Sequence, residues 1–309
     1  MTINISASSL KGVLFATLTA CLWAVLAIVL KVTVEYVPPA TIVWFRFTTA
    51  FVILFIYFLV AQRKALTIFL KPPILLVLAA LFLGMNYIGY MQGIHYTTPN
   101  NTQLFIQLGP ILLAVSGIVI YKEKVTKRQI LGFLLALTGL GFFYSQQLSA
   151  FAHKELIYNK GVAWVIFGAV SWASYSVIQK KLVRFHPVHQ LNLIIYGLPA
   201  LLYIPLADFS IFADINWKVW LLLLFCGVNT LIAYGSLTLA FKYLEANKIS
   251  VIIICNPIIT FILMAFLGYW QVSWIAPEYM NFLSVFGAVL VITGAIFVVF
   301  FRKKKALAR

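Results

Sequence analysis

Long apolar segments follow one another along nearly the whole chain, and this feature constrains the fold more than any other. A helix that crosses a bilayer needs about 20 mostly apolar residues. Ten such segments are found, at residues 12–31, 41–61, 74–95, 103–121, 129–148, 161–181, 190–207, 218–241, 250–270 and 282–301. Hydrophobic residues make up 63% of the chain, whereas soluble domains hold about 45–50%. The sequence therefore predicts an all-α polytopic membrane protein with ten transmembrane helices and no separate soluble domain.

The distribution of positive charge predicts how the chain is oriented in the membrane. With the N-terminus in the cytoplasm, 18 of the 23 Lys and Arg residues lie at cytoplasmic helix ends or in cytoplasmic loops. The opposite side holds Lys31, Lys154, Lys160 and Lys218, and Arg46 lies within a segment. This pattern follows the positive-inside rule, so both termini are expected in the cytoplasm. The net charge of +16 is thus better explained by topology and by contact with anionic lipid than by nucleic acid as a partner.

The sequence offers no motif for a metal, a cofactor or catalysis. Cys21, Cys226 and Cys255 all fall inside apolar segments and lack the spacing of metal ligands, so they are expected to pack as small apolar residues. The four histidines form no HExxH pair. We therefore expect neither a metal site nor a bound cofactor, and no enzyme activity.

The two halves of the sequence resemble each other. With an offset of 149 residues Trp23 aligns with Trp172, and with an offset of 147 residues Pro110 aligns with Pro257. We therefore expect two five-helix repeats, residues 1–150 and residues 151–309, the second with a basic cytoplasmic tail. Because five is odd, the second repeat must enter the membrane from the opposite side. Inverted repeats of this kind are the architecture of many secondary transporters.

A proline interrupts an apolar segment at the matching place in each half, in "IQLGPILLAV" and in "ICNPIITFIL". Proline has no N–H and clashes with the carbonyl four residues earlier. Pro110 and Pro257 therefore deprive the carbonyls of Ile106 and Ile253 of their helical donors. Matched interruptions point to the central site of a transporter, so we expect both prolines to act as hinges. The alternative is a static kink, since proline is common in membrane helices.

Polar and aromatic side chains inside the segments are the candidates for a central cavity. A charge at a helix centre costs about 2.5–3.5 kcal/mol on insertion scales, which draws attention to Arg46. The candidates for substrate binding are Trp23, Arg46, Asn86, Tyr87, Tyr90, Gln103, Gln107, Trp172, Tyr175, Tyr234 and Asn256. Arg46 is expected either to bind a substrate carboxylate or to hold a gate through carbonyls or a polar side chain. Two further alternatives stay open. Buried amides often hold membrane helices together, and Arg46 could snorkel to the headgroups.

Three further patterns predict structure rather than transport. Gly132 with Gly139, and Gly287 with Gly294, have the seven-residue spacing that suits close contact between helices. The stretch "TKRQ" from residue 126 to residue 129 resembles a capping box at a helix start. Glu123 lies between two lysines and is expected to be solvated.

Several stretches together resemble the drug/metabolite transporter superfamily, and within it the EamA-type ten-helix exporters. They include "LWAVLAIVLK", "VWFRF", "SWASYSVIQKKL" and "LAFKYLEANKISVIIICNPIITFILMAFLG", and they extend over nearly the whole chain. The family tends to keep a glutamate after the proline-bearing segment of both halves. Glu123 matches that pattern in the first half, but Trp270 and Gln271 stand there in the second. The resemblance implies a multi-pass carrier of the bacterial inner membrane that exports amino acids or related metabolites.

These observations together predict a secondary transporter for a small, largely neutral or zwitterionic metabolite. It is expected to work by alternating access, with protons as a candidate coupling ion. A lipid-handling carrier or flippase is one alternative, because an apolar, aromatic cavity suits a lipid as well. An antiporter for phosphorylated metabolites is another, but it needs several fixed cations near the midplane, where the sequence offers Arg46.

Overall fold

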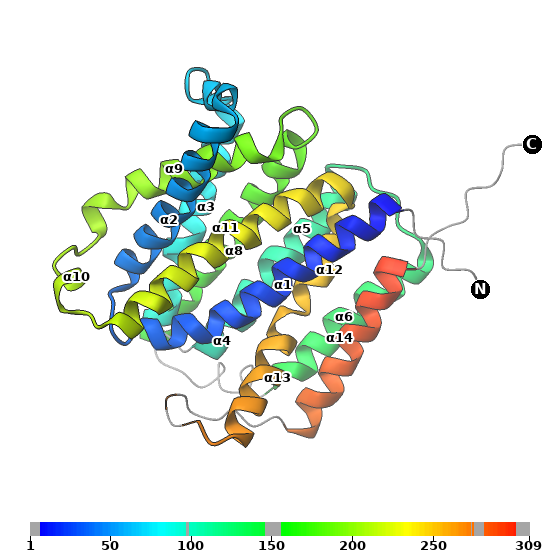
Figure 1. The fold of residues 1–309 in the computed structure, drawn as a ribbon. Coiled ribbons are helices and arrows are strands. Elements are labelled where there is room, and N and C mark those ends of the chain that lie inside the picture. The colour runs from blue at the N-terminus through cyan, green and yellow to red at the C-terminus, as the bar shows by residue number, and fades with distance from the viewer. Residues whose placement is uncertain (1–6, 97–98, 146–155, 273, 275–280, 301–309) are drawn as a thin grey trace, which may run out of the picture.

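The structure is a computed structural model that describes residues 7–96, 99–145, 156–272, 274 and 281–300. These residues form helices and the connections between them, with no strand among them (Figure 1), which confirms the all-α prediction. The α-helices are α1 (Ala7–Thr33), α2 (Pro39–Ala61), α3 (Ile74–Tyr96), α4 (Pro99–Ile106), α5 (Leu108–Val119), α6 (Lys127–Phe143), α8 (Leu156–Leu182), α9 (Val188–Leu202), α10 (Ile211–Asp214), α11 (Trp217–Tyr243), α12 (Ala246–Ile254), α13 (Asn256–Tyr269) and α14 (Phe282–Phe300). Two short 3₁₀ helices, η1 (Arg63–Phe69) and η2 (Ile204–Leu206), lie in connections.

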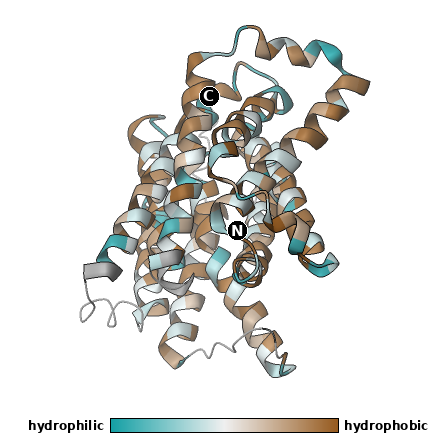
Figure 2. Cartoon of the chain, turned by 90° about the vertical axis from the view of Figure 1, so that its left-hand side faces the viewer, coloured by the Kyte–Doolittle hydropathy of each residue, from teal (hydrophilic) through white to brown (hydrophobic). Residues whose placement is uncertain are grey.

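Eight helical stretches are long and apolar enough to cross a membrane. Two of these stretches are interrupted helices, Thr102–Val119 and Ala246–Tyr269. The other two predicted segments form α6 and α9, of 17 and 15 residues, so the count of ten crossing helices stays a prediction. Hydrophobic residues run along most of the helix lengths, and strongly hydrophilic ones gather near helix ends and connections (Figure 2), as expected for a multi-pass membrane protein.

Helices of the two halves pack against each other in matched pairs. α3 packs against α8, and α1 packs against α11, which are the equivalent helices with the halves exchanged. Two hydrogen bonds between the halves show the same relation, because each joins residues that match those of the other. Asn86 Nδ2 donates to the carbonyl of Gly168 at 2.9 Å, and Thr19 Oγ1 donates to the carbonyl of Ala233 at 3.1 Å. These four residues occupy matched positions under the offsets of 147 and 149 residues.

The molecule has two opposite faces at which helices begin and end. The terminal face is the one where α1 begins, at Ala7, and where α14 ends, at Phe300; both helix ends lie on the same side (Figure 1). The far face is the opposite one, where α1 ends at Thr33 and α2 begins at Pro39. The positive-inside rule predicts that the terminal face is cytoplasmic.

α6 and α14 meet through glycines, as their spacing predicts. A Cβ on Gly139 would lie 2.7 Å from the carbonyl oxygen of Gly287, and one on Gly132 would lie 2.8 Å from that of Gly294. Such distances leave no room for a side chain, so the prediction of close helix contact is confirmed.

α6 also begins with the predicted capping box. The N–H of Thr126 donates to Gln129 Oε1 at 2.9 Å, and the N–H of Gln129 donates to Thr126 Oγ1 at 3.2 Å.

Each matched proline follows a break in its helix. The first break is at Gln107, between α4 and α5, and the second is at Cys255, between α12 and α13. α5 and α12 pack against each other, and Ser250 Oγ donates to the carbonyl of Pro110 at 2.5 Å. The two interrupted helices therefore meet beside their breaks in the interior of the protein.

Glu123 is partly buried and not solvated, so that expectation is wrong. Its carboxylate accepts from the backbone N–H groups of Ala246 at 2.8 Å and Asn247 at 3.0 Å. These groups open α12 and have no partner within their own helix. The N-cap residue, Glu245, offers no side-chain bond to them, and the positive end of α12 attracts a carboxylate. Glu123 and the start of α12 form a contact between the halves, called the clasp below, at the terminal face.

Two more contacts lie at the terminal face, and the second of them joins the halves. Lys180 Nζ donates to the carbonyls of Phe241, at 2.9 Å, and Leu244, which close the C-terminal end of α11. The hydroxyl of Tyr121 donates to the carbonyl of Val177. Burial raises the pKa of Tyr121 to about 12, partly opposed by the nearby Arg184, so this phenol keeps its proton at neutral pH.

Candidate functional site

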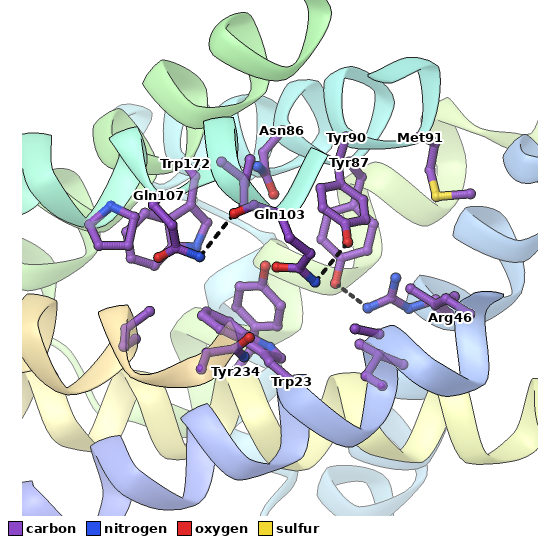
Figure 3. A pocket seen from close by; sticks show the side chains of 17 residues that line it. Trp23, Arg46, Asn86, Tyr87, Tyr90, Met91, Gln103, Gln107, Trp172 and Tyr234 are labelled. Atoms are coloured by element: carbon purple, nitrogen blue, oxygen red, sulfur yellow. Dashed lines mark hydrogen bonds between the residues drawn. The ribbon is translucent and has the colours of Figure 1, made fainter. Parts of the chain in front are cut away.

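A cavity lies between the two halves, close to both helix breaks. Ten of the eleven predicted substrate-binding candidates line it (Figure 3): Trp23, Arg46, Asn86, Tyr87, Tyr90, Gln103, Gln107, Trp172, Tyr234 and Asn256. They come from both halves of the chain. Tyr175 is not among the lining residues; it is buried behind Tyr234, with ring centroids 5.9 Å apart. Of the two prolines, Pro110 lines the cavity and Pro257 does not.

Arg46 is the cation of the cavity, and it is buried, with 5% of its surface exposed. Its Nε donates to Thr230 Oγ1 and its Nη2 donates to the hydroxyl of Tyr87, both at 3.0 Å. The guanidinium carbon also lies 4.5 Å from the centroid of the Tyr87 ring. The side chain thus turns into the protein, against the snorkelling alternative. Both hydrogen-bond partners are neutral, so they hold the guanidinium in place without compensating its charge.

Aromatic rings form one wall of the cavity. Trp23 lies at its centre, with ring centroids 6.0 Å from Trp172 and 5.3 Å from Tyr234. Tyr87 continues the wall, 6.1 Å from Tyr234. Trp23 and Trp172 occupy matched positions in the two halves, so these equivalent residues meet in the interior. Such a wall offers a flat, polarizable surface to the apolar part of a ligand.

The four amides of the cavity divide into two pairs. Asn86 and Asn256 donate to backbone carbonyls of neighbouring helices, those of Gly168 and Ala20, and so also hold helices together. Gln103 and Gln107 come from the interrupted helix. Gln103 Nε2 donates to the hydroxyl of Tyr90, and Gln107 Nε2 donates to the carbonyl of Gln103, both at 3.2 Å. The packing alternative therefore applies to the first pair more than to the second.

The family model of the EamA-like transporter family matches the chain twice, at residues 10–145 and 159–300. The chain belongs to the EamA-like transporter family. The two matches cover nearly all of the chain, and membership makes this protein a transporter rather than an enzyme.

Curated relatives of the EamA-like protein agree with this membership. It is 33% identical over 289 residues to the "Uncharacterized inner membrane transporter YhbE" of Escherichia coli strain K12, which covers 93% of this chain and 90% of the relative. It is 32% identical over 290 residues to an "Uncharacterized transporter" of Haemophilus influenzae, which covers 93% and 94%. A solved structure titled "Crystal structure of protein" matches 95% of the chain with a TM-score of 0.73 at 21% identity, which supports the fold alone. The EamA-like protein is therefore a multi-pass inner-membrane transporter.

The cavity of this EamA-like protein continues toward the far face. A second hollow shares Ala27, Leu30, Tyr90 and Gln103 with it and adds residues closer to that face, among them Lys31, Ile94 and Met264. None of the described residues that line either hollow is acidic. Arg46 thus has no counter-ion within the described lining.

The sequence did not reveal the apolar part of the lining. Leu26, Ala27, Leu30, Met91, Ile106 and Ile253 line the cavity as well. In a membrane helix, an apolar residue that faces a cavity has the same character as one that faces lipid, so composition cannot separate them. For Ile106 and Ile253 a signal was available, because each lies four residues before a matched proline.

Proposed function

We propose that this EamA-like protein exports a small metabolite that carries a carboxylate, an amino acid or a related compound, by alternating access. One observation carries the proposal: Arg46 is a buried cation with neutral partners, in a cavity whose described lining holds no acid. An uncompensated cation in a poorly solvated site attracts an anionic group strongly. The planar guanidinium favours a carboxylate in particular, because it can form two parallel hydrogen bonds to it.

The remaining lining supports a small organic ligand over a bare ion. Apolar and aromatic side chains cover most of the cavity, and a few polar groups lie among them. This combination is usual for small-molecule sites, where the apolar surface holds the body of the ligand and the polar groups fix its orientation.

Alternating access is supported by residues at matched positions of the two halves that lie in different environments. Ser250 binds the carbonyl of Pro110 and is fully buried, whereas its match, Gln103, lines the cavity. If matched residues exchange their contacts, the far face closes and the terminal face opens.

The two alternatives fit the cavity less well. A phosphorylated metabolite carries two negative charges on its phosphate and is usually held by several cations, and the cavity around the aromatic wall offers Arg46. A lipid would need a path for its acyl chains, and no described feature indicates one.

The experiment is transport by purified protein in liposomes. Uptake of labelled amino acids should exceed that of a labelled sugar phosphate and of labelled phospholipid, with and without a pH gradient to test proton coupling. Substrates for the assay can be chosen beforehand from compounds that raise the melting temperature of the protein. Transport of phospholipid or of the sugar phosphate, with no transport of any carboxylate, would contradict the proposal.

A further inference from the structure

Gln107 carries an acceptor with no partner inside the cavity. Its side chain is 4% exposed, and its Oε1 is buried without a hydrogen bond. The orientation of the amide is fixed, because Nε2 donates to the carbonyl of Gln103, which can only accept. The atom left for a ligand is therefore the oxygen. Buried acceptors without a partner are rare in proteins, and one in a ligand cavity indicates a donor on the ligand.

The backbone near Gln107 is interrupted. Gln107 stands at the break between α4 and α5, and Pro110 cannot donate to the carbonyl of Ile106. Pro257 cannot donate to the carbonyl of Ile253 either, and that carbonyl accepts from the N–H of Cys255. Ile106 and Ile253 both line the cavity together with Gln107. The unpartnered acceptor in this part of the cavity is Gln107 Oε1, whereas Arg46 supplies donors.

Gln107 and Arg46 lie at opposite ends of the cavity, with Gln103, Tyr234 and Trp23 between them (Figure 3). Resting on the function proposed above, we propose that the cavity selects substrates with a carboxylate at one end and an amine at the other. The carboxylate binds Arg46, the ammonium group donates to Gln107 Oε1, and an apolar body lies against the aromatic wall. A small α-amino acid carries both charges on neighbouring atoms, so it can bind either Arg46 or Gln107 Oε1 but not both at once. An amino acid whose amine is separated from the carboxylate by a ring or a chain satisfies both.

The test uses three ligands of the same shape: 4-(aminomethyl)benzoate, 4-ethylbenzoate, which lacks the amine, and 4-ethylbenzylamine, which lacks the carboxylate. Their affinities for the purified full-length protein are measured by calorimetry. In the unaltered protein, the compound with both groups should bind about tenfold or more tightly than 4-ethylbenzoate, as expected for a hydrogen bond to a charged group. Glycine should bind more weakly than either.

Gln107→Met removes the acceptor with little change in size. It should abolish the preference for the amine, while binding of 4-ethylbenzoate persists and shows that the variant is folded. Gln179→Met is the matched control. Gln179 is buried in α8 with an Oε1 that likewise lacks a partner, but it does not line the cavity, so its variant should keep the full preference.

The outcomes separate this inference from the proposed function. If 4-ethylbenzoate binds and Arg46→Gln abolishes its binding, but the amine adds no affinity or Gln107→Met keeps the preference, this inference is wrong and the carboxylate proposal stands. If neither benzoate binds, the carboxylate proposal fails, and the inference fails with it.

Discussion

Arg46 donates through two of its nitrogens to two hydroxyls on different helices, and a lysine has no planar group that could copy this geometry. We therefore expect both Arg46→Lys and Arg46→Gln to insert normally and to lose roughly tenfold or more of the transport rate for a carboxylate substrate. The measurement is uptake into liposomes at matched protein content. Full activity in the glutamine variant would remove the role in carboxylate binding, and full activity in the lysine variant alone would leave a role for charge without the guanidinium geometry.

At the same scale, the sequence predicted the polar lining better than the apolar lining. An amide or a charge inside a membrane helix needs a partner or water, so Arg46 and Gln107 had a physical reason to face the interior. Tyr175 had the same sequence signal but packs behind the cavity wall, because an aromatic ring is also stable in a packed core. Glu123 was expected in solvent because no pattern in the sequence indicates that the start of α12 lies beside it.

The two helix breaks give a prediction at the scale of elements. Pro110→Ala and Pro257→Ala each restore a backbone donor, which favours a continuous helix across the break. We expect both variants to fold and to transport roughly tenfold more slowly, because the hinge becomes stiffer. Transport rates are measured in liposomes, with the melting temperature of each variant as the folding control. Normal transport in both would support a static kink.

The glycine contact between α6 and α14 offers a second test at this scale. Gly139→Leu forces a side chain against the backbone of Gly287, and overpacking of this kind costs about 1–3 kcal/mol of stability. Gly141→Leu is the matched control on the same helix, because a Cβ there would meet nothing within 4 Å. We expect the melting temperature in detergent to fall for the first variant and to stay unchanged for the second. Equal melting temperatures would show that the helices separate easily at this point.

Most helices could be predicted because the thickness of the bilayer sets the length of an apolar segment that crosses it. The predicted segments lie within α1, α3 and α11, which are slightly longer. The breaks at Gln107 and Cys255 were indicated by proline. Their place could not be fixed, since each break lies two or three residues before the proline and depends on packing against the other half. α9 is shorter than its predicted segment, because η2 begins soon after Leu202.

For the whole molecule, the positive-inside pattern predicts that the terminal face is cytoplasmic. Reporter fusions at Arg309 and in the connection near Ala152 should report opposite sides of the membrane, with the C-terminal fusion inside the cell. A reporter that is active only in the cytoplasm and one that is active only outside it give independent readings. A periplasmic C-terminus would contradict the orientation, and two fusions that report the same side would contradict the inverted repeat.

The clasp formed by Glu123 and the start of α12 has no copy at the matched positions among the residues that the structure describes at the far face. α4, the match of α12, begins with Pro99, which has no N–H, and Trp270 and Gln271 stand where a second glutamate would be. Among the described residues, closing the terminal face is therefore favoured by a contact without a counterpart at the matched positions of the far face. We expect the empty carrier to be closed toward the cytoplasm most of the time. A ligand that needs a rarely populated state binds with an apparent affinity lowered by that population.

The carrier would then export the metabolite above a threshold concentration rather than at all concentrations. At low cytoplasmic concentrations little of the metabolite would be exported. Export would begin when the metabolite accumulates enough to bind the rarely populated state that is open to the cytoplasm. Glu123→Gln weakens the clasp, so we expect it to lower the substrate concentration for half-maximal export severalfold while uptake from outside becomes less efficient. Transport measured in both directions across oriented vesicles checks this, and unchanged half-saturation on the cytoplasmic side would mean that the clasp does not set the threshold.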